Sequence, residues 1–156
     1  SEEGTLPRKK IRIRNYPGSS KSEYFLEIKI SSVEGKFKTS IKKNIDEVSY
    51  IKSNGYFDSA YGLCYPILWV SYLREYFIIN NHRITLDHDI EYESQNFNYN
   101  YRDKEVLILE LKSRGKIMNN FFEDLIPIQK IRYSKYCSGV EFLYNNIIYQ
   151  RLSKKF

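Results

Sequence analysis

The chain contains segments in which basic and apolar residues alternate with a period of two. The first three cover residues 9–16, 24–31 and 36–41. In the first, Lys10, Arg12 and Arg14 alternate with apolar residues, and Arg8, just before it, continues the same spacing. Successive side chains of a strand point to opposite faces of a sheet, so each segment is predicted to be a strand with one apolar and one basic face. Strands curled with their charged faces inward would form a basic pore. Phosphate chains are the first candidate ligand for such a pore.

Turn and capping residues separate these first segments from the middle of the chain. Pro17 ends the first strand, and Gly35 lies in a turn that lets the second and third segments pair as a basic hairpin. The alternation stops at residues 44–52. There, Asp46 is predicted to cap a short helix.

Residues 66–77 alternate as well, but neither of their faces is purely apolar. One face carries Arg74 among apolar neighbours, and the other carries Glu75 beside Trp69 and Leu73. Either face is suited to burial, so the orientation of this predicted strand stays open.

Two later segments give further strands. In residues 82–89, Arg83, Thr85 and Asp87 lie on one side, and the intervening apolar residues lie on the other. We therefore expect Arg83 to face away from the apolar side. Asp87 is either a second acidic member of the site or a cap on the turn after its strand. Residues 105–112 have the strongest strand pattern.

The remaining segments are less regular. Residues 92–101 are rich in Asn and Tyr and are predicted to be a strand or an exposed loop. Residues 117–125 are predicted to be a short helix that stops before Pro127, and residues 129–140 and 141–152 are predicted to be helices or irregular packing segments. The predicted fold is mainly β (α+β), with antiparallel strands and a few short flanking helices.

Composition and charge fit a single domain over residues 1–156 with an anionic partner. The chain is 42% hydrophobic, enough for one real core, and has a formal net charge of +6. It has no apolar stretch long enough to span a membrane, its first ten residues lack the apolar core of a secretory signal, and it has two cysteines. We expect a reducing, cytoplasmic location, with the cytoplasmic face of a membrane as the location of a longer parent protein.

Six short segments follow one another in order: KIRIRNY at 10–16, FLEIK at 25–29, YLREYF at 72–77, RITLD at 83–87, LELK at 109–112 and SKYC at 134–137. Their order, spacing and residue types resemble the VTC domain family, the polyphosphate polymerases of the triphosphate tunnel metalloenzyme (CYTH-like) superfamily. The resemblance covers residues 8–140. It implies a tunnel of about eight antiparallel strands, closed like a small barrel around a charged interior. Further strands and a helix precede the KIRIR segment in the family, so we expect the N-terminal part of the family domain to be missing here.

The resemblance also implies roles for individual residues. It implies that six cations of the tunnel are catalytic: Arg12, Arg14, Lys29, Arg74, Arg83 and Lys112. It implies three further phosphate-binding residues: Arg8, Lys38 and Lys135. Glu110 matches the glutamate that binds a divalent ion, Mn²⁺ or Mg²⁺. Such a site suits phosphoryl transfer, which needs charge neutralisation and positioning more than covalent help from the protein. The implied reaction transfers the terminal phosphate of ATP to a growing polyphosphate chain and releases ADP. The implied partners are ATP and polyphosphate, with no nucleic acid and no membrane contact by this chain itself.

Other interpretations of the same residues stay open. The tunnel is also suited to a hydrolase of inorganic triphosphate, or to a non-catalytic module that binds polyphosphate or single-stranded nucleic acid by charge and stacking. Glu110 favours an enzyme, because a pure polyanion binder gains nothing from a carboxylate in its basic face. The expected absence of N-terminal strands favours the binding module. The pairs Glu27 with Lys29 and Glu110 with Lys112 are alternatively cross-strand ion pairs of little energetic weight.

Overall fold

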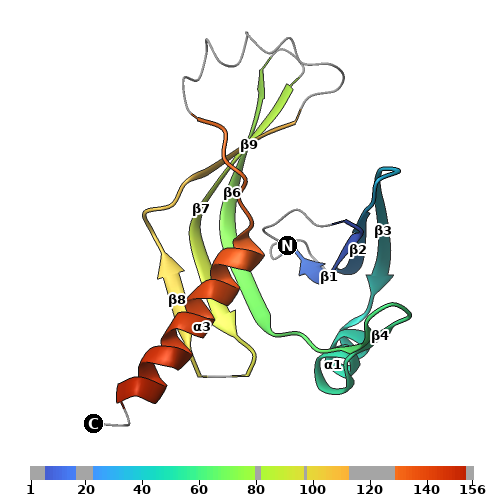
Figure 1. Cartoon of the computed structure of the whole chain (residues 1–156). Helices are drawn as coiled ribbons and strands as arrows, with labels where there is room; N and C mark the ends of the chain where they lie inside the picture. Colours follow the sequence, from blue (N-terminus) through green and yellow to red (C-terminus); the bar gives the residue numbers. More distant parts are fainter. Residues whose placement is uncertain (1–5, 17–22, 80–81, 97, 113–128, 154–156) are drawn as a thin grey trace. The chain divides into compact units, whose positions relative to one another are not determined.

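The computed structural model (Figure 1) is mainly β, as the sequence predicts, and describes residues 6–16, 23–79, 82–96, 98–112 and 129–153. The chain divides into two compact units, Ser1–Pro66 (unit 1) and Ile67–Phe156 (unit 2), and each is described by itself. The single domain expected over residues 1–156 stays a prediction. Within the described residues the strands form three antiparallel sheets, and no closed barrel is found.

Unit 1 contains a three-stranded sheet whose strands follow one another in the chain. β1 (Arg8–Asn15), β2 (Tyr24–Ser31) and β3 (Lys36–Lys43) pair in sequence order, each antiparallel to the next. The predicted basic hairpin is confirmed as the pairing of β2 with β3. The prediction succeeded here because polar and apolar residues alternate along β2, which places Leu26 and Glu27 on opposite faces of the sheet.

Helix α1 (Ile45–Asn54) begins after Asn44, not at the predicted Asp46. The Asn44 side chain accepts a hydrogen bond from the Glu47 backbone N–H at 2.8 Å, and the Glu47 carboxylate accepts one from the Asn44 N–H at 2.9 Å. Two otherwise unpaired N–H groups are satisfied by this reciprocal arrangement, which is why the helix begins there. Asp46 lies in the first turn, and Val48, on the inner side of the helix, is buried.

A short hairpin completes unit 1 and has no counterpart among the predictions. It consists of β4 (Tyr56–Asp58) and β5 (Gly62–Cys64), each only three residues long. The buried Asp58 carboxylate forms an ion pair with Lys9 Nζ at 2.7 Å, which ties the hairpin to β1. Strands this short contain too few residues for an alternating pattern to be recognised.

Unit 2 is a four-stranded sheet centred on its longest strand. β7 (His82–Ser94) pairs with β6 (Leu68–Ile79) on one side, and on the other with both β8 (Asn100–Asp103) and β9 (Ile108–Lys112). The strands predicted at 66–77, 82–89 and 105–112 are confirmed, although β7 runs further and β9 begins later than predicted. The late start of β9 comes after a turn in which the Asp103 carboxylate accepts hydrogen bonds from two backbone N–H groups.

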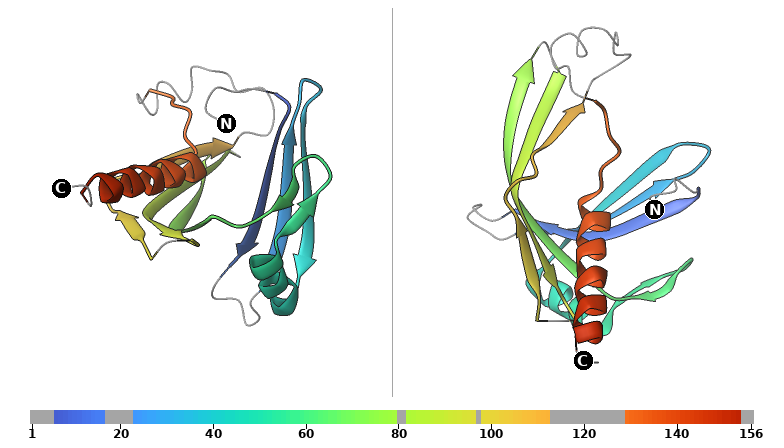
Figure 2. Two further views of the ribbon diagram at one scale, coloured as in Figure 1. Left: turned by 60° about the horizontal axis from the view of Figure 1, so that its bottom comes forward. Right: turned by 60° about the vertical axis from the view of Figure 1, so that its left-hand side comes forward.

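A single helix, α3 (Lys135–Ser153), replaces the two segments predicted at 129–140 and 141–152. It lies across the sheet of unit 2 in the views of Figure 1 and Figure 2. Gly139 is buried where the helix meets Leu68 and Tyr92, and a side-chain carbon there would come within 2.6 Å of both residues. This close approach fixes the start of α3, and with it Lys135, against the sheet.

Two further expectations concern helices. The helix predicted at 117–125 lies outside the described residues. Of the helices in the described part of the chain, none is long and apolar enough to cross a membrane.

Candidate functional site

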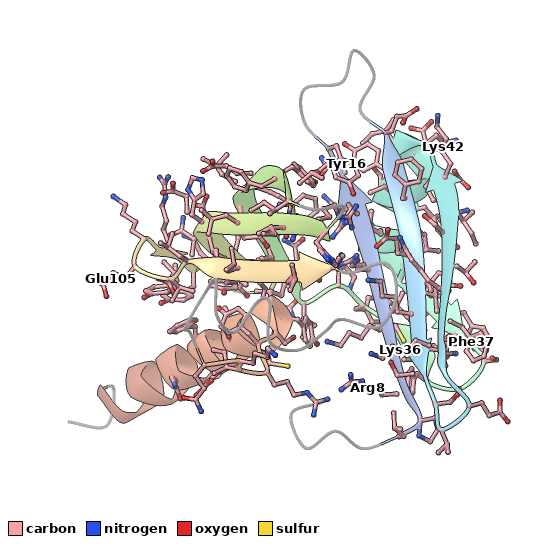
Figure 3. All side chains as sticks on the ribbon, turned by 90° about the horizontal axis from the view of Figure 1, so that it is seen from above. Arg8, Tyr16, Lys36, Phe37, Lys42 and Glu105 are labelled. Carbon is pink, nitrogen blue, oxygen red and sulfur yellow. The ribbon has the colours of Figure 1, made fainter. Side chains whose placement is uncertain are left out.

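Strand register places the predicted cations of unit 1 on one face of its sheet. Arg12 lies directly opposite Glu27 on β2, and Glu27 lies opposite Ser40 on β3. Residues paired across strands share a face, and the face continues at every second residue. Figure 3 shows two neighbours on β3, Lys36 and Phe37, on opposite sides of this sheet. The basic face of unit 1 therefore contains every site residue predicted for this unit: Arg8, Arg12, Arg14, Lys29 and Lys38.

A buried carboxylate lies at the centre of this basic face. Glu27 is 4% exposed, and its two oxygens contact Arg12 Nη2 at 2.5 Å and Lys38 Nζ at 2.6 Å. Burial alone raises the pKa of the Glu27 carboxyl, but the hydrogen bonds from Lys38 and Arg12 outweigh it and lower that pKa to about 2. Glu27 is therefore ionised at neutral pH and holds one cation from each neighbouring strand.

In unit 2 the predicted residues lie on one face of the sheet around β7. Arg74 on β6 lies opposite Asp87, Thr85 lies opposite Glu110 on β9, and Arg83 lies opposite Lys112. These positions are two residues apart along β7, so their side chains share a face. We call this set the unit 2 cluster; with Lys135 from α3 it consists of Arg74, Arg83, Thr85, Asp87, Glu110, Lys112 and Lys135.

Asp87 is the buried centre of the unit 2 cluster. Its side chain is fully buried and accepts two parallel hydrogen bonds from Arg74, Nε to Oδ1 at 2.5 Å and Nη2 to Oδ2 at 2.7 Å. Lys135 also donates to Oδ2. Burial alone raises the pKa of Asp87, but Arg74 and Lys135 outweigh it and hold the pKa below its usual value. The alternative of a cap on a turn is wrong, because Asp87 lies within β7.

The same two cations also share one aromatic ring. The Arg74 guanidinium lies 5.2 Å and the Lys135 ammonium 4.4 Å from the centre of the Tyr72 ring. Both distances allow cation–π attraction. Asp87 and Tyr72 thus hold Arg74 and Lys135 at fixed positions, although the two cations come from different elements and 61 positions separate them in the numbering (135 − 74).

Glu110 is the accessible carboxylate of the unit 2 cluster. Its side chain is 45% exposed, and its contacts are loose: Lys112 Nζ lies 3.3 Å and Arg74 Nη2 3.8 Å from its oxygens. Arg83 is exposed and forms no hydrogen bond or ion pair with any residue that the structure describes. One carboxylate and two cations of the cluster are thus open to a ligand.

The donor set suits a divalent ion that is bound together with phosphate. Within the described residues no group of three or more Asp, Glu, His or Cys side chains is placed to hold a metal. Mg²⁺ commonly binds one or two carboxylates and completes its shell with phosphate oxygens and water. Glu110 fits that pattern, whereas Asp87 has both oxygens occupied by cations.

Sequence reasoning missed one structurally important acidic residue, Asp58, and left the role of a second, Asp87, open between a member of the site and a cap on a turn. Asp58, which pairs with Lys9, has no recognisable pattern around it. Asp87 does have a recognisable pattern, because it lies on the same side of β7 as Arg83. A carboxylate on a basic side is a candidate partner for several cations. Its link to Lys135 spans 48 residues and could not be found from local spacing.

A comparison with protein-family models matches the VTC domain over residues 1–144. The chain belongs to the VTC domain family. This confirms the family that the six motifs indicate, and it places the chain in a polyphosphate-related family. Neither the curated proteins nor the solved structures gave a significant match to this VTC domain.

Proposed function

We propose that this VTC domain transfers the terminal phosphate of ATP to a growing polyphosphate chain and releases ADP. The observation that carries the proposal is the unit 2 cluster, in which four cations surround one buried and one accessible carboxylate: Arg74, Arg83, Lys112 and Lys135 around Asp87 and Glu110. A polyanion binder needs the cations alone. The accessible carboxylate is what favours an enzyme that works with a metal ion.

The proposed reaction needs no nucleophile from the protein. An oxygen of the terminal phosphate of the chain attacks the γ-phosphorus of ATP. The bond from that phosphorus to the β,γ-bridging oxygen breaks, and ADP leaves with the electron pair. Catalysis of such a transfer consists of holding the phosphates in line and neutralising charge on their oxygens.

The cations of the cluster suit this task in different ways. Arg83 and Lys112 are accessible and can move onto phosphate oxygens. Arg74 keeps its orientation because two of its nitrogens are bound by Asp87, so little conformational entropy is lost when it meets a phosphate. The basic face of unit 1 is by itself also suited to binding phosphate, with Arg12 and Lys38 held by Glu27.

Glu110 is the residue proposed to hold Mn²⁺ or Mg²⁺, with oxygens of the substrate and water as the other ligands. Bound there, the ion would offset negative charge on the phosphate oxygens. Glu27 and Asp87 are less suited to this role, since each already binds two cations and is almost fully buried.

The proposal is tested by incubating the chain with ATP and Mn²⁺ and measuring ADP, free phosphate and polyphosphate together. Glu110→Ala is compared with Glu105→Ala, a matched loss of an exposed carboxylate just before β9; Figure 3 labels Glu105. We expect ADP and polyphosphate from the wild type and from Glu105→Ala, and neither from Glu110→Ala.

Three other outcomes would contradict parts of the proposal. Free phosphate without polyphosphate would show a hydrolase. Polyphosphate binding without any ATP consumption would show a binding module. Full activity of Glu110→Ala with an unchanged dependence on Mn²⁺ would exclude Glu110 as the residue that holds the ion.

A further inference from the structure

Thr85 carries a buried hydroxyl in the middle of the unit 2 cluster. It lies on β7 between Arg83 and Asp87, directly opposite Tyr76 on one neighbouring strand and Glu110 on the other. The residue is 1% exposed. Its Oγ1 atom is buried and has no hydrogen-bond partner among the residues that the structure describes.

An unpaired buried hydroxyl is unfavourable, and a strand offers an easy way to avoid it. Valine has nearly the same shape as threonine, is equally suited to a β-strand and carries no polar atom. A threonine at this position leaves a polar group without the water that it would bind in the unfolded chain. A hydrogen-bond partner from outside the surrounding residues would therefore satisfy the Thr85 hydroxyl.

The surroundings of Thr85 indicate the chemistry of that partner. Two residues away on the same strand and face is the exposed Arg83, and Lys112 lies opposite Arg83 on β9. Cations on this face attract an anion, and a hydroxyl donates a strong hydrogen bond to an anionic oxygen. We infer that Thr85 is a phosphate-binding residue whose hydroxyl donates a hydrogen bond to a phosphate oxygen of the bound chain. The inference rests on the proposed function for the class of ligand.

A ligand oxygen reaches Oγ1 after a neighbouring side chain moves. The two residues directly opposite are exposed, Tyr76 by 60% as a residue and Glu110 by 45% at its side chain. Exposed side chains change rotamer within nanoseconds, and the ion pairs of Glu110 at 3.3 and 3.8 Å are of the weak surface kind. A phosphate that binds Lys112 and Arg74 in place of Glu110 frees the Glu110 side chain to move. The phosphate oxygens can then reach Thr85 Oγ1.

The test compares Thr85→Val, which removes only the hydroxyl, with Thr85→Ser, which keeps it. The probe is inorganic tripolyphosphate, with binding measured by calorimetry and stability by thermal unfolding without ligand. Thr39→Val serves as the control, because Thr39 is an exposed strand threonine on the face of β3 opposite the basic face. We expect Thr85→Val to raise the dissociation constant about 5- to 10-fold, and Thr85→Ser and Thr39→Val to bind like the wild type.

The sign of the stability change separates binding from a structural role. Thr85→Val should unfold at the same temperature as the wild type or higher, because it removes an unpaired buried hydroxyl. Unchanged tripolyphosphate binding by Thr85→Val would overturn the inference. A loss of both stability and binding that Thr85→Ser does not restore, or a wild type that does not bind tripolyphosphate, would overturn it as well.

These measurements are independent of phosphoryl transfer. Weaker binding by Thr85→Val together with no polyphosphate synthesis by the wild type would support Thr85 as a ligand and refute the polymerase. Polyphosphate synthesis by the wild type together with unchanged tripolyphosphate binding by Thr85→Val would support the polymerase and refute Thr85 as a ligand.

Discussion

Replacement of Asp87 by asparagine should destabilise unit 2 strongly. Asparagine keeps the shape of the side chain but loses the charge, and one of the two acceptor oxygens becomes an NH₂ donor. The Nε and Nη2 atoms of Arg74 and the Nζ atom of Lys135 converge on the wild-type carboxylate, so the variant leaves two cations beside a neutral amide.

The size of the effect depends on the burial of the three side chains. Asp87 has no exposure, and the side chains of Arg74 and Lys135 are only 16% and 19% exposed. Removal of one member of such a buried network costs about 3–5 kcal/mol, compared with about 0–1 kcal/mol for a surface pair. We expect the free energy of unfolding of Asp87→Asn to fall by about 3 kcal/mol or more.

Asp89→Asn provides a matched control on the same strand. Asp89 pairs with His88 and Arg102, but its side chain is 33% exposed. Its backbone φ is 50°, a conformation that asparagine adopts readily. We expect a loss of at most about 1 kcal/mol.

Urea unfolding followed by tryptophan fluorescence measures both changes. The chain has one tryptophan, Trp69 on β6, so the signal reports on unit 2. If Asp87→Asn lost no more stability than Asp89→Asn, the assignment of Asp87 as the anchor of Arg74 and Lys135 would be wrong.

Two further predictions concern the basic face of unit 1 and the accessible cation of unit 2. The Glu27 carboxyl has a pKa of about 2 when folded and an ordinary value of 4.5, so its ionised form stabilises the fold above about pH 4.5 and this contribution is lost as the pH falls toward 2. At about 1.4 kcal/mol for each pKa unit, the free energy of unfolding of the wild type at pH 7 should exceed that of Glu27→Gln by about 3 kcal/mol. Urea titrations followed by circular dichroism should show this difference in stability disappear near pH 2. A difference that stays constant with pH would contradict the ion pairs. Arg83→Gln should change the free energy of unfolding by at most about 0.5 kcal/mol, because Arg83 is exposed and unpaired among the described residues. The same variant should raise the dissociation constant of tripolyphosphate about tenfold. Unchanged binding would exclude Arg83 from the site.

Local patterns predicted the longer strands because polar and apolar residues alternate along them. The alternation in unit 1 located β2 at Tyr24–Ser31 with both ends correct, since polar and apolar residues alternate along it from Leu26 to Ser31. It failed for β4 and β5, where three residues carry no period. The start of α1 was misplaced because Asn44 and Asp46 are both good caps, and only Asn44 has a glutamate three residues later.

The candidate site depended on contacts that no local pattern contains. Motif order supplied the cations Arg74, Arg83 and Lys112, and register alone then places them on one face of unit 2. The role of Asp87 required the fold, because its two cations come from β6 and from the first residue of α3. The unpaired hydroxyl of Thr85 is likewise recognised only when all neighbours are in place.

The central claim is that this VTC domain builds polyphosphate from ATP. The most direct measurement incubates the chain with ATP labelled at the γ-phosphate and Mn²⁺, and compares labelled polymer with released ADP. The proposed transfer predicts one labelled phosphate in polymer for each ADP, with both products lost in Glu110→Ala. Label recovered entirely as free phosphate, or no ADP release at all, would contradict it.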